Sequence, residues 1–169
     1  MYVYCLYCRT QRCARIAGLL EIRGVRKAFS PTILQKQRVE GRNVFQRRDL
    51  LPGYVFLFHD ERLTGRETFA GIDGVIRRVG RRDTGYELEG ADREFALGLL
   101  ERNGQVGEMR LVTVGETVRL EDDLFGGSEG VVTKIDRRKE RARVDFRFDG
   151  GACHTWVALE DVRPADGNQ

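Results

Sequence analysis

Four cysteines and two histidines are the residues whose types first suggest chemistry. Cys5 and Cys8 have the C-x-x-C spacing of zinc ligands, Cys13 follows them, and His154 is a possible fourth ligand. Residues 2–8, however, are rich in β-forming side chains and predict a strand. Positions three apart on a strand point to opposite faces, so Cys5 and Cys8 cannot share one ion. We therefore predict reduced structural thiols, with no metal and no cofactor.

The rest of the chain offers no pattern that is typical of an enzyme. It contains no G-x-x-x-x-G-K-[ST] phosphate loop and no G-x-G-x-x-G run. It also lacks a recognisable pair of nucleophile and base. We predict a protein that binds partners and catalyses no reaction.

Basic side chains are concentrated in the first fifty residues. Residues 1–50 carry 11 Lys and Arg against 3 Asp and Glu, residues 51–111 carry 9 against 11, and residues 112–169 carry 9 against 12. Such a block, in a chain of net charge +3, is typical of a surface that binds a polyanion. Arginine outnumbers lysine there, and its planar fork fits phosphate oxygens. A solvated basic surface without a ligand is the alternative.

The candidate nucleic-acid-binding residues fall on a predicted helix, a predicted polar hairpin and a later turn. They are Arg9, Arg12 and Arg15 on the helix, Lys36, Arg38, Arg42, Arg47 and Arg48 on the hairpin, and Arg137, Arg138, Lys139 and Arg141 on the turn. A two-stranded basic ribbon can lie along a phosphate backbone. We expect an RNA hairpin or single-stranded DNA as the target, and these residues do not distinguish the two. For the turn, a solvated loop is an equal alternative because acidic residues flank it.

Periodicity and turn residues predict an α+β chain of two domains. The predicted strands are 2–8, 54–58, 74–80, 117–120, 130–135, 141–148 and 155–159, with a hairpin over 33–48 and helices over about 10–22, 64–72 and 92–104. Helices on a mixed or antiparallel sheet make an α/β sandwich of residues 1–103. Residues 104–111 predict a linker, and the short strands of residues 112–169 predict a small all-β barrel.

No segment approaches the roughly 20 consecutive apolar residues that cross a bilayer. The first residues also lack a basic leader followed by an apolar stretch, as a secretion signal would have. We therefore expect a cytoplasmic protein without a membrane partner.

Residues 47–58, RRDLLPGYVFLF, change from arginine to almost continuous apolar side chains. On a strand, Tyr54 and Phe56 share one face and Val55 and Leu57 share the other. The predicted helices cover one face, and nothing obvious in the sequence covers the second. We therefore predict that part of this segment contacts a partner. A strand buried on both faces is the alternative.

The order of these motifs resembles that of NusG-type transcription factors. Residues 51–57, LPGYVFL, are similar to the family's F-P-G-Y-V-x-V signature, and residues 74–80 resemble its P-G-V-x-x-F-V-G segment, with Asp73 in place of proline. Residues 114–120 and 125–132 are similar to a KOW motif. The resemblance covers nearly the whole chain. It implies a NusG N-terminal-like (NGN-like) domain followed by an SH3-like KOW barrel.

The resemblance also implies a function. In NusG-like proteins the N-terminal domain docks on the clamp helices of RNA polymerase through an apolar patch and favours processive elongation, and the KOW domain recruits other partners. On the matching positions it implies that Leu51, Pro52, Tyr54 and Phe56 bind RNA polymerase, with Leu51 replacing an aromatic residue. Tyr and Phe suit such a site because they bury a large area at low entropic cost. A monomer is expected.

Departures from the family pattern favour a specialised, operon-specific paralog of LoaP or RfaH type. Asp149-Gly150-Gly151 stands where general factors have Phe-Gly-Arg, the tip that meets Rho and a small-subunit ribosomal protein. Together with the basic N-terminal block, this predicts an antitermination factor with its own nucleic-acid contact. Two alternatives stay open. One is a general NusG that couples polymerase to Rho or the ribosome, and the other is a stand-alone KOW-type RNA-binding protein.

Overall fold

The computed structural model describes residues 1–63, 68–128 and 130–160. The chain is mixed α+β, as predicted, and divides into two compact units. Unit 1 comprises Met1–Thr32 and Asp49–Gln105, and unit 2 comprises Ile33–Arg48 and the chain from Val106 onward. The division after residue 105 lies within the predicted linker, whereas the inclusion of residues 33–48 in unit 2 was not predicted. No helix of the described residues is long and apolar enough to cross a membrane.

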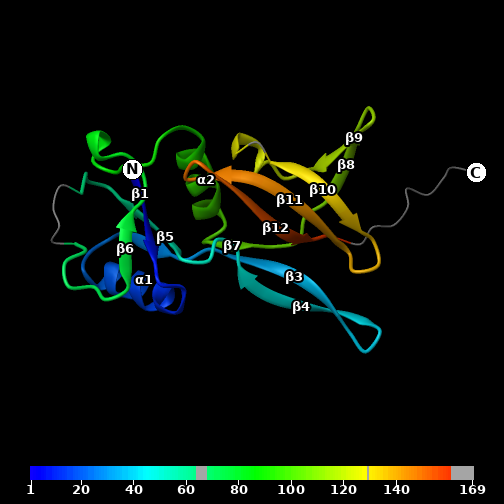
Figure 1. Cartoon of the computed structure of the whole chain (residues 1–169), viewed down its shortest axis with the longest axis horizontal. Helices are drawn as coiled ribbons and strands as arrows, with labels where there is room; N and C mark the ends of the chain where they lie inside the picture. The colour runs from blue at the N-terminus through cyan, green and yellow to red at the C-terminus, as the bar shows by residue number, and fades with distance from the viewer. Residues whose placement is uncertain (64–67, 129, 161–169) are drawn as a thin grey trace, which may run out of the picture. The chain divides into compact units, whose positions relative to one another are not determined.

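A four-stranded antiparallel sheet of order β2-β5-β1-β6 is the centre of unit 1 (Figure 1). Its elements are β1 (Tyr2–Cys8), a 3-10 turn (Thr10–Arg12), α1 (Cys13–Ile22), β2 (Lys27–Phe29), β5 (Tyr54–His59), β6 (Val75–Arg78), a second 3-10 turn (Arg82–Thr84) and α2 (Gly90–Glu101). The three strands predicted here are confirmed, and the helices predicted over 10–22 and 92–104 are confirmed with shifted ends. Of the helix predicted over 64–72, residues 64–67 lie outside the described residues and 68–71 form turns.

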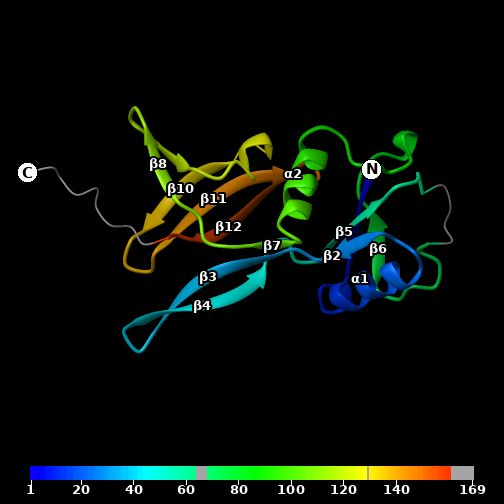
Figure 2. The same cartoon turned by 180° about the vertical axis from the view of Figure 1, so that it is seen from behind.

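The two helices of unit 1 cover opposite faces of this sheet (Figure 2). Ile16 and Leu20 of α1 belong to the same core cluster as Val55 and Leu57 of β5. On the other face, Phe95 of α2 meets the ring of Phe56 edge-on, with 6.4 Å between centroids. The expectation that one face of β5 lacks a cover within the chain is therefore wrong, and both faces are buried by unit 1 itself.

The cysteines of unit 1 are free thiols that are buried in its core. Cys8 and Cys13, the first residue of α1, lie in the core cluster between this helix and the sheet, whereas Cys5 pairs with Phe56 of β5 and lies on the opposite face. Burial raises the pKa of the Cys8 thiol to about 12, with a further contribution from Cys13. At neutral pH this thiol stays protonated, which makes it a poor nucleophile and a poor metal ligand. Within the described ranges, no group of three or more His, Cys, Asp or Glu is placed to hold a metal ion.

Unit 2 contains three groups of paired strands. They are β4-β3-β7, with β3 (Thr32–Val39), β4 (Arg42–Asp49) and β7 (Gln105–Val106); β8 (Leu111–Val114) with β9 (Thr117–Leu120); and β10 (Val131–Asp136), β11 (Arg141–Phe148) and β12 (Gly151–Ala158) in antiparallel order. Among the described residues these ladders do not close into the predicted barrel, and a 3-10 turn (Gly126–Ser128) lies between β9 and β10. Glu40 and Gly41, both with positive φ, form the two-residue turn of the hairpin β3–β4.

Every second side chain of β11 is buried, and these side chains form the core of the C-terminal strands. Ala142, Val144, Phe146 and Phe148 are buried on one face, and the residues between them lie on the other. The ring of Phe125 packs 5.0 Å from that of Phe146. The period-two pattern that predicted this strand is therefore the pattern that fills the core.

Gly53 joins the Pro-Gly turn to β5, and its backbone has φ of +91°. A Cβ at this position would stand 2.8 Å from Cε2 of Tyr7 and 3.0 Å from the carbonyl oxygen of Cys8. Gly53→Ala should therefore lower the free energy of unfolding by about 1–3 kcal/mol. In Gly18→Ala, on α1, the new Cβ meets nothing within 4 Å, so stability should stay the same or rise by up to ~1 kcal/mol. Thermal unfolding of the two variants measures this, and equal effects would contradict it.

Candidate nucleic-acid interface

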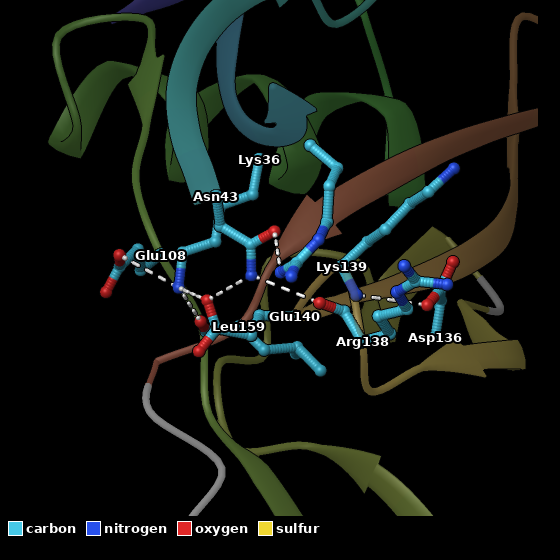
Figure 3. Close-up of polar contacts among 9 residues, drawn as sticks. Lys36, Asn43, Glu108, Asp136, Arg138, Lys139, Glu140 and Leu159 are labelled. Atoms are coloured by element: carbon cyan, nitrogen blue, oxygen red, sulfur yellow. Dashed lines mark hydrogen bonds and ion pairs between the residues drawn. The ribbon is translucent and has the colours of Figure 1, made fainter. Parts of the chain in front are cut away.

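A buried lysine joins the hairpin β3–β4 to the C-terminal strands of unit 2 (Figure 3). The Lys36 side chain is only 8% exposed. Its Nζ donates to the carbonyl oxygen of Leu159 at 2.6 Å and lies 3.2 Å from Glu140 Oε2 and 3.5 Å from Glu108 Oε1. A buried ammonium is costly unless it is paired and hydrogen-bonded. These oxygens therefore stabilise the hairpin in this position.

Asn43 makes a second link between the hairpin and the β10–β11 turn. Its Nδ2 donates to Glu140 Oε2 at 2.9 Å and to the carbonyl oxygen of Arg138 at 3.1 Å (Figure 3). The hydrogen bonds from Asn43 and Lys36 lower the pKa of the Glu140 carboxyl group below its usual value. Glu140 is thus charged at neutral pH and accepts from both arms of the hairpin.

A polar groove of about 310 Å³ lies where the hairpin faces the β10–β11 turn. Its lining residues are Gln35, Lys36, Gln37, Arg38, Gln46, Arg48, Lys139 and Arg141. In the described part of the chain, no carboxylate lies within ion-pair distance of Arg48 or Lys139. The glutamine amides add donors and acceptors beside these cations. Such a groove can hold phosphate oxygens and hydrogen-bond the edges of bases.

The groove brings together two basic clusters that are far apart in the sequence. Arg38 and Arg48 come from the hairpin, and Lys139 and Arg141 come from the later turn. Four other predicted residues are exposed in unit 2 but do not line the groove: Arg42, Arg47, Arg137 and Arg138. Lys36 lines it, but its ammonium is occupied by Glu108 and Glu140, so its role is structural and the prediction of a phosphate contact is wrong.

The arginines of the first helical segment belong to unit 1 and do not line the groove. Arg9 and Arg15 are exposed. Arg12 forms an ion pair with Asp73, 3.3 Å from NH2 to Oδ2, and is partly neutralised. Their predicted contact with nucleic acid stays a prediction.

The residues predicted to bind RNA polymerase differ in exposure. Leu51 is 4% exposed and Phe56 is 0% exposed, so both lie in the core of unit 1 and the prediction that they face a partner is wrong. Pro52 is exposed and Tyr54 is half-buried. The ring of Tyr54 lies 5.1 Å from that of half-buried Tyr7. Pro52 and Tyr54 are therefore the residues among these four that reach the surface, with Tyr7 of β1 beside Tyr54.

Several residues of the interface were missed at the level of sequence. Glu108, Glu140 and Asn43 position the hairpin, and Gln35 and Gln46 line the groove. Each is a common polar residue in a polar segment, which gives no local signal for a contact across the chain. Asn43 next to the hairpin turn was the one position whose type favoured a specific hydrogen-bonding role.

Comparisons with known proteins do not identify a relative. A scan against protein-family models found no match, and a search of the curated proteins found none either. The function is therefore inferred from the residues and their geometry.

Lys36→Met tests whether the buried ammonium holds the hairpin in place. The variant keeps most of the apolar stem but leaves the Leu159 oxygen and two carboxylates without their cation, so unit 2 should lose about 1–3 kcal/mol of stability. Urea unfolding followed by the fluorescence of Trp156, the single tryptophan, measures this. The pKa of Glu140 is lower in the folded protein than in the unfolded chain. Glu140 therefore adds to the free energy of unfolding of the wild type above pH ~4.5, and this contribution is lost as the pH falls through the pKa of the folded protein.

In the Lys36→Met variant the free energy of unfolding should depend less on pH in this acid range, because Lys36 is one cause of the lowered pKa of Glu140. Lys134→Met is the matched control, because Lys134 is exposed on β10 and should change stability by less than about 0.5 kcal/mol. Equal stability of the two variants would contradict a structural role for Lys36.

Proposed function

We propose that this protein is a non-catalytic transcription elongation or antitermination factor of the NusG type, which holds nucleic acid in the groove of unit 2. The observation that carries the proposal is the groove, in which cations from the hairpin and from the β10–β11 turn line one polar hollow. Phosphate oxygens are the natural partners of such a set of guanidinium and ammonium groups.

The chemistry of the groove favours a polynucleotide over a small anion. Four of its cations, Arg38, Arg48, Lys139 and Arg141, carry more charge than one small anion neutralises, which suits a ligand with several phosphates. The side-chain amides of Gln35, Gln37 and Gln46 are able to hydrogen-bond base edges. An operon-specific factor that touches its own nucleic-acid element would need both kinds of contact.

The role in transcription is supported by the motifs at residues 51–57, 74–80 and 114–132. We propose that the surface of unit 1 around Pro52, Tyr54 and Tyr7 contacts RNA polymerase. Phe56 and Leu51 would act there only by supporting β5 and the turn before it. A monomeric cytoplasmic factor is part of the same proposal.

A second candidate function is a stand-alone RNA-binding protein of KOW type. The burial of Phe56 and Phe58 favours it, because the apolar segment is explained without any partner. The groove serves this function equally well. Binding to RNA polymerase separates the two candidates.

Arg48→Gln combined with Lys139→Gln tests the groove. Binding of a short RNA hairpin or single-stranded oligonucleotide should weaken at least tenfold, because two phosphate contacts are removed. The slope of log K against log salt should decrease by about 0.7 per lost contact for a single strand. Arg110→Gln is the control, since this arginine already pairs with Glu160 at 2.9 Å. Unchanged affinity in the double variant would overturn the proposed groove.

Tyr54→Ala and Phe56→Ala, made as two separate variants, test the polymerase contact. Tyr54 is half-buried, so Tyr54→Ala should weaken binding to purified RNA polymerase while the protein stays folded. Phe56→Ala should instead destabilise unit 1 by about 3–5 kcal/mol because its ring is fully buried. Binding is measured by surface immobilisation of the polymerase, and folding by circular dichroism. If wild-type protein does not bind polymerase, the stand-alone RNA-binding function is supported instead.

A further inference from the structure

The outward face of the β10–β11–β12 sheet carries a second set of arginines. Four residues of β11 lie opposite its buried face: Arg141, Arg143, Asp145 and Arg147. Directly opposite residues of an antiparallel pair share a face. Trp156 therefore lies beside Arg143, and His154 beside Asp145. The face thus combines cations with one large aromatic ring.

The guanidinium of Arg141 lies over the ring of Trp156 on this face. The guanidinium carbon of Arg141 lies 4.0 Å from the centroid of the Trp156 ring. The Nε of Arg141 is buried without a hydrogen-bond partner in the described residues, and Asp136 Oδ2 stands 3.7 Å away. A guanidinium over an indole ring combines a planar cation with an aromatic surface. Unpaired nucleobases stack on arginine planes and aromatic rings of this kind.

A hollow of about 390 Å³ lies on the same face, with Arg143, Arg147 and His154 in its lining. Its volume is within the range of sites that hold small organic groups. Arg143 Nε donates to Asp145 Oδ1 at 2.9 Å, and Arg147 NH2 donates to the Gly150 carbonyl oxygen at 3.2 Å. Asp145 offsets part of the positive charge, so attraction to phosphate alone is weaker here than in the groove. Stacking is the contact that this face adds.

We propose that this face is a binding platform for a single-stranded polynucleotide. An unpaired base stacks on the Arg141–Trp156 pair, and Arg143 and Arg147 contact the neighbouring phosphates. Arg141 also lines the groove, so the platform continues it along β11 for about 20 Å from Arg141 to Arg147. The inference rests on the proposed function only in taking a polynucleotide as the ligand. It adds a surface and a preference for unpaired bases.

The fluorescence of Trp156 gives a direct test, because it is the only tryptophan of the chain. Full-length protein is titrated with a twelve-nucleotide single strand, as RNA and as DNA of the same sequence, with the matching duplex, and with polyglutamate. At least one of the two single strands should quench the fluorescence. A comparison of the affinities for RNA and DNA shows whether the 2′-hydroxyl contributes. Binding at saturation without any change in fluorescence would overturn the platform. Equal affinity for polyglutamate would overturn it as well.

Arg141→Lys separates stacking from charge. The variant keeps the positive charge but loses the plane, so affinity for the single strand should fall by about 5- to 150-fold while affinity for the duplex stays the same. Arg143→Gln with Arg147→Gln should lower the salt slope by about 0.7 per substitution. Arg110→Gln is again the control. Equal losses for single strand and duplex in Arg141→Lys would contradict a stacking role.

The variants test the platform and the groove separately. Arg141 lines both surfaces, so Arg143→Gln with Arg147→Gln is the variant that separates them. If Arg48→Gln with Lys139→Gln weakens binding but this variant does not, the proposed function stands and the platform is wrong. If only the platform variants weaken binding, the groove is wrong and the single-strand site remains.

Discussion

The ammonium group of Lys36 lies where the hairpin β3–β4 meets the C-terminal strands, and the groove depends on that contact. An unpaired charge at 8% exposure would favour an open arrangement of the hairpin. Glu140, Glu108 and the Leu159 oxygen make the closed arrangement favourable, and Asn43 adds directional hydrogen bonds to the same carboxylate. In the sequence Lys36 looks like a phosphate ligand. In the structure it holds the hairpin in place, and thereby positions the other cations of the groove, which can contact phosphate.

The same distinction between support and contact applies to unit 1. The aromatic residues of β5 resemble a docking patch, but Phe56 packs between Phe29 and Phe95 and serves the core. Tyr54 at the end of the strand remains half-exposed beside Tyr7. A conformationally stable strand that ends in a partly exposed aromatic pair can present that pair to a partner at low entropic cost.

Local patterns in the sequence predicted much of the fold and less of the interface. The strand Tyr2–Cys8 and the alternation of Ala142, Val144 and Phe146 follow from period-two burial, which a single sequence shows directly. The cover over Phe56 was missed because it comes from α2 and from the short strand β2, both distant in sequence. The pairing of Lys36 with Glu140 was missed for the same reason. The charge distribution predicted a polyanion-binding surface but did not show which of its cations pair with carboxylates inside the protein.

The central claim is that the hairpin and the β10–β11 turn act as one surface for a polynucleotide. Photo-cross-linking of the full-length protein to an oligonucleotide that carries 4-thiouridine, followed by peptide mapping, tests it most directly. We predict cross-links in both Gln35–Arg48 and Lys139–Arg141 from the same complex. Cross-links confined to one of these segments, or to Arg9–Arg15 of unit 1, would contradict the account.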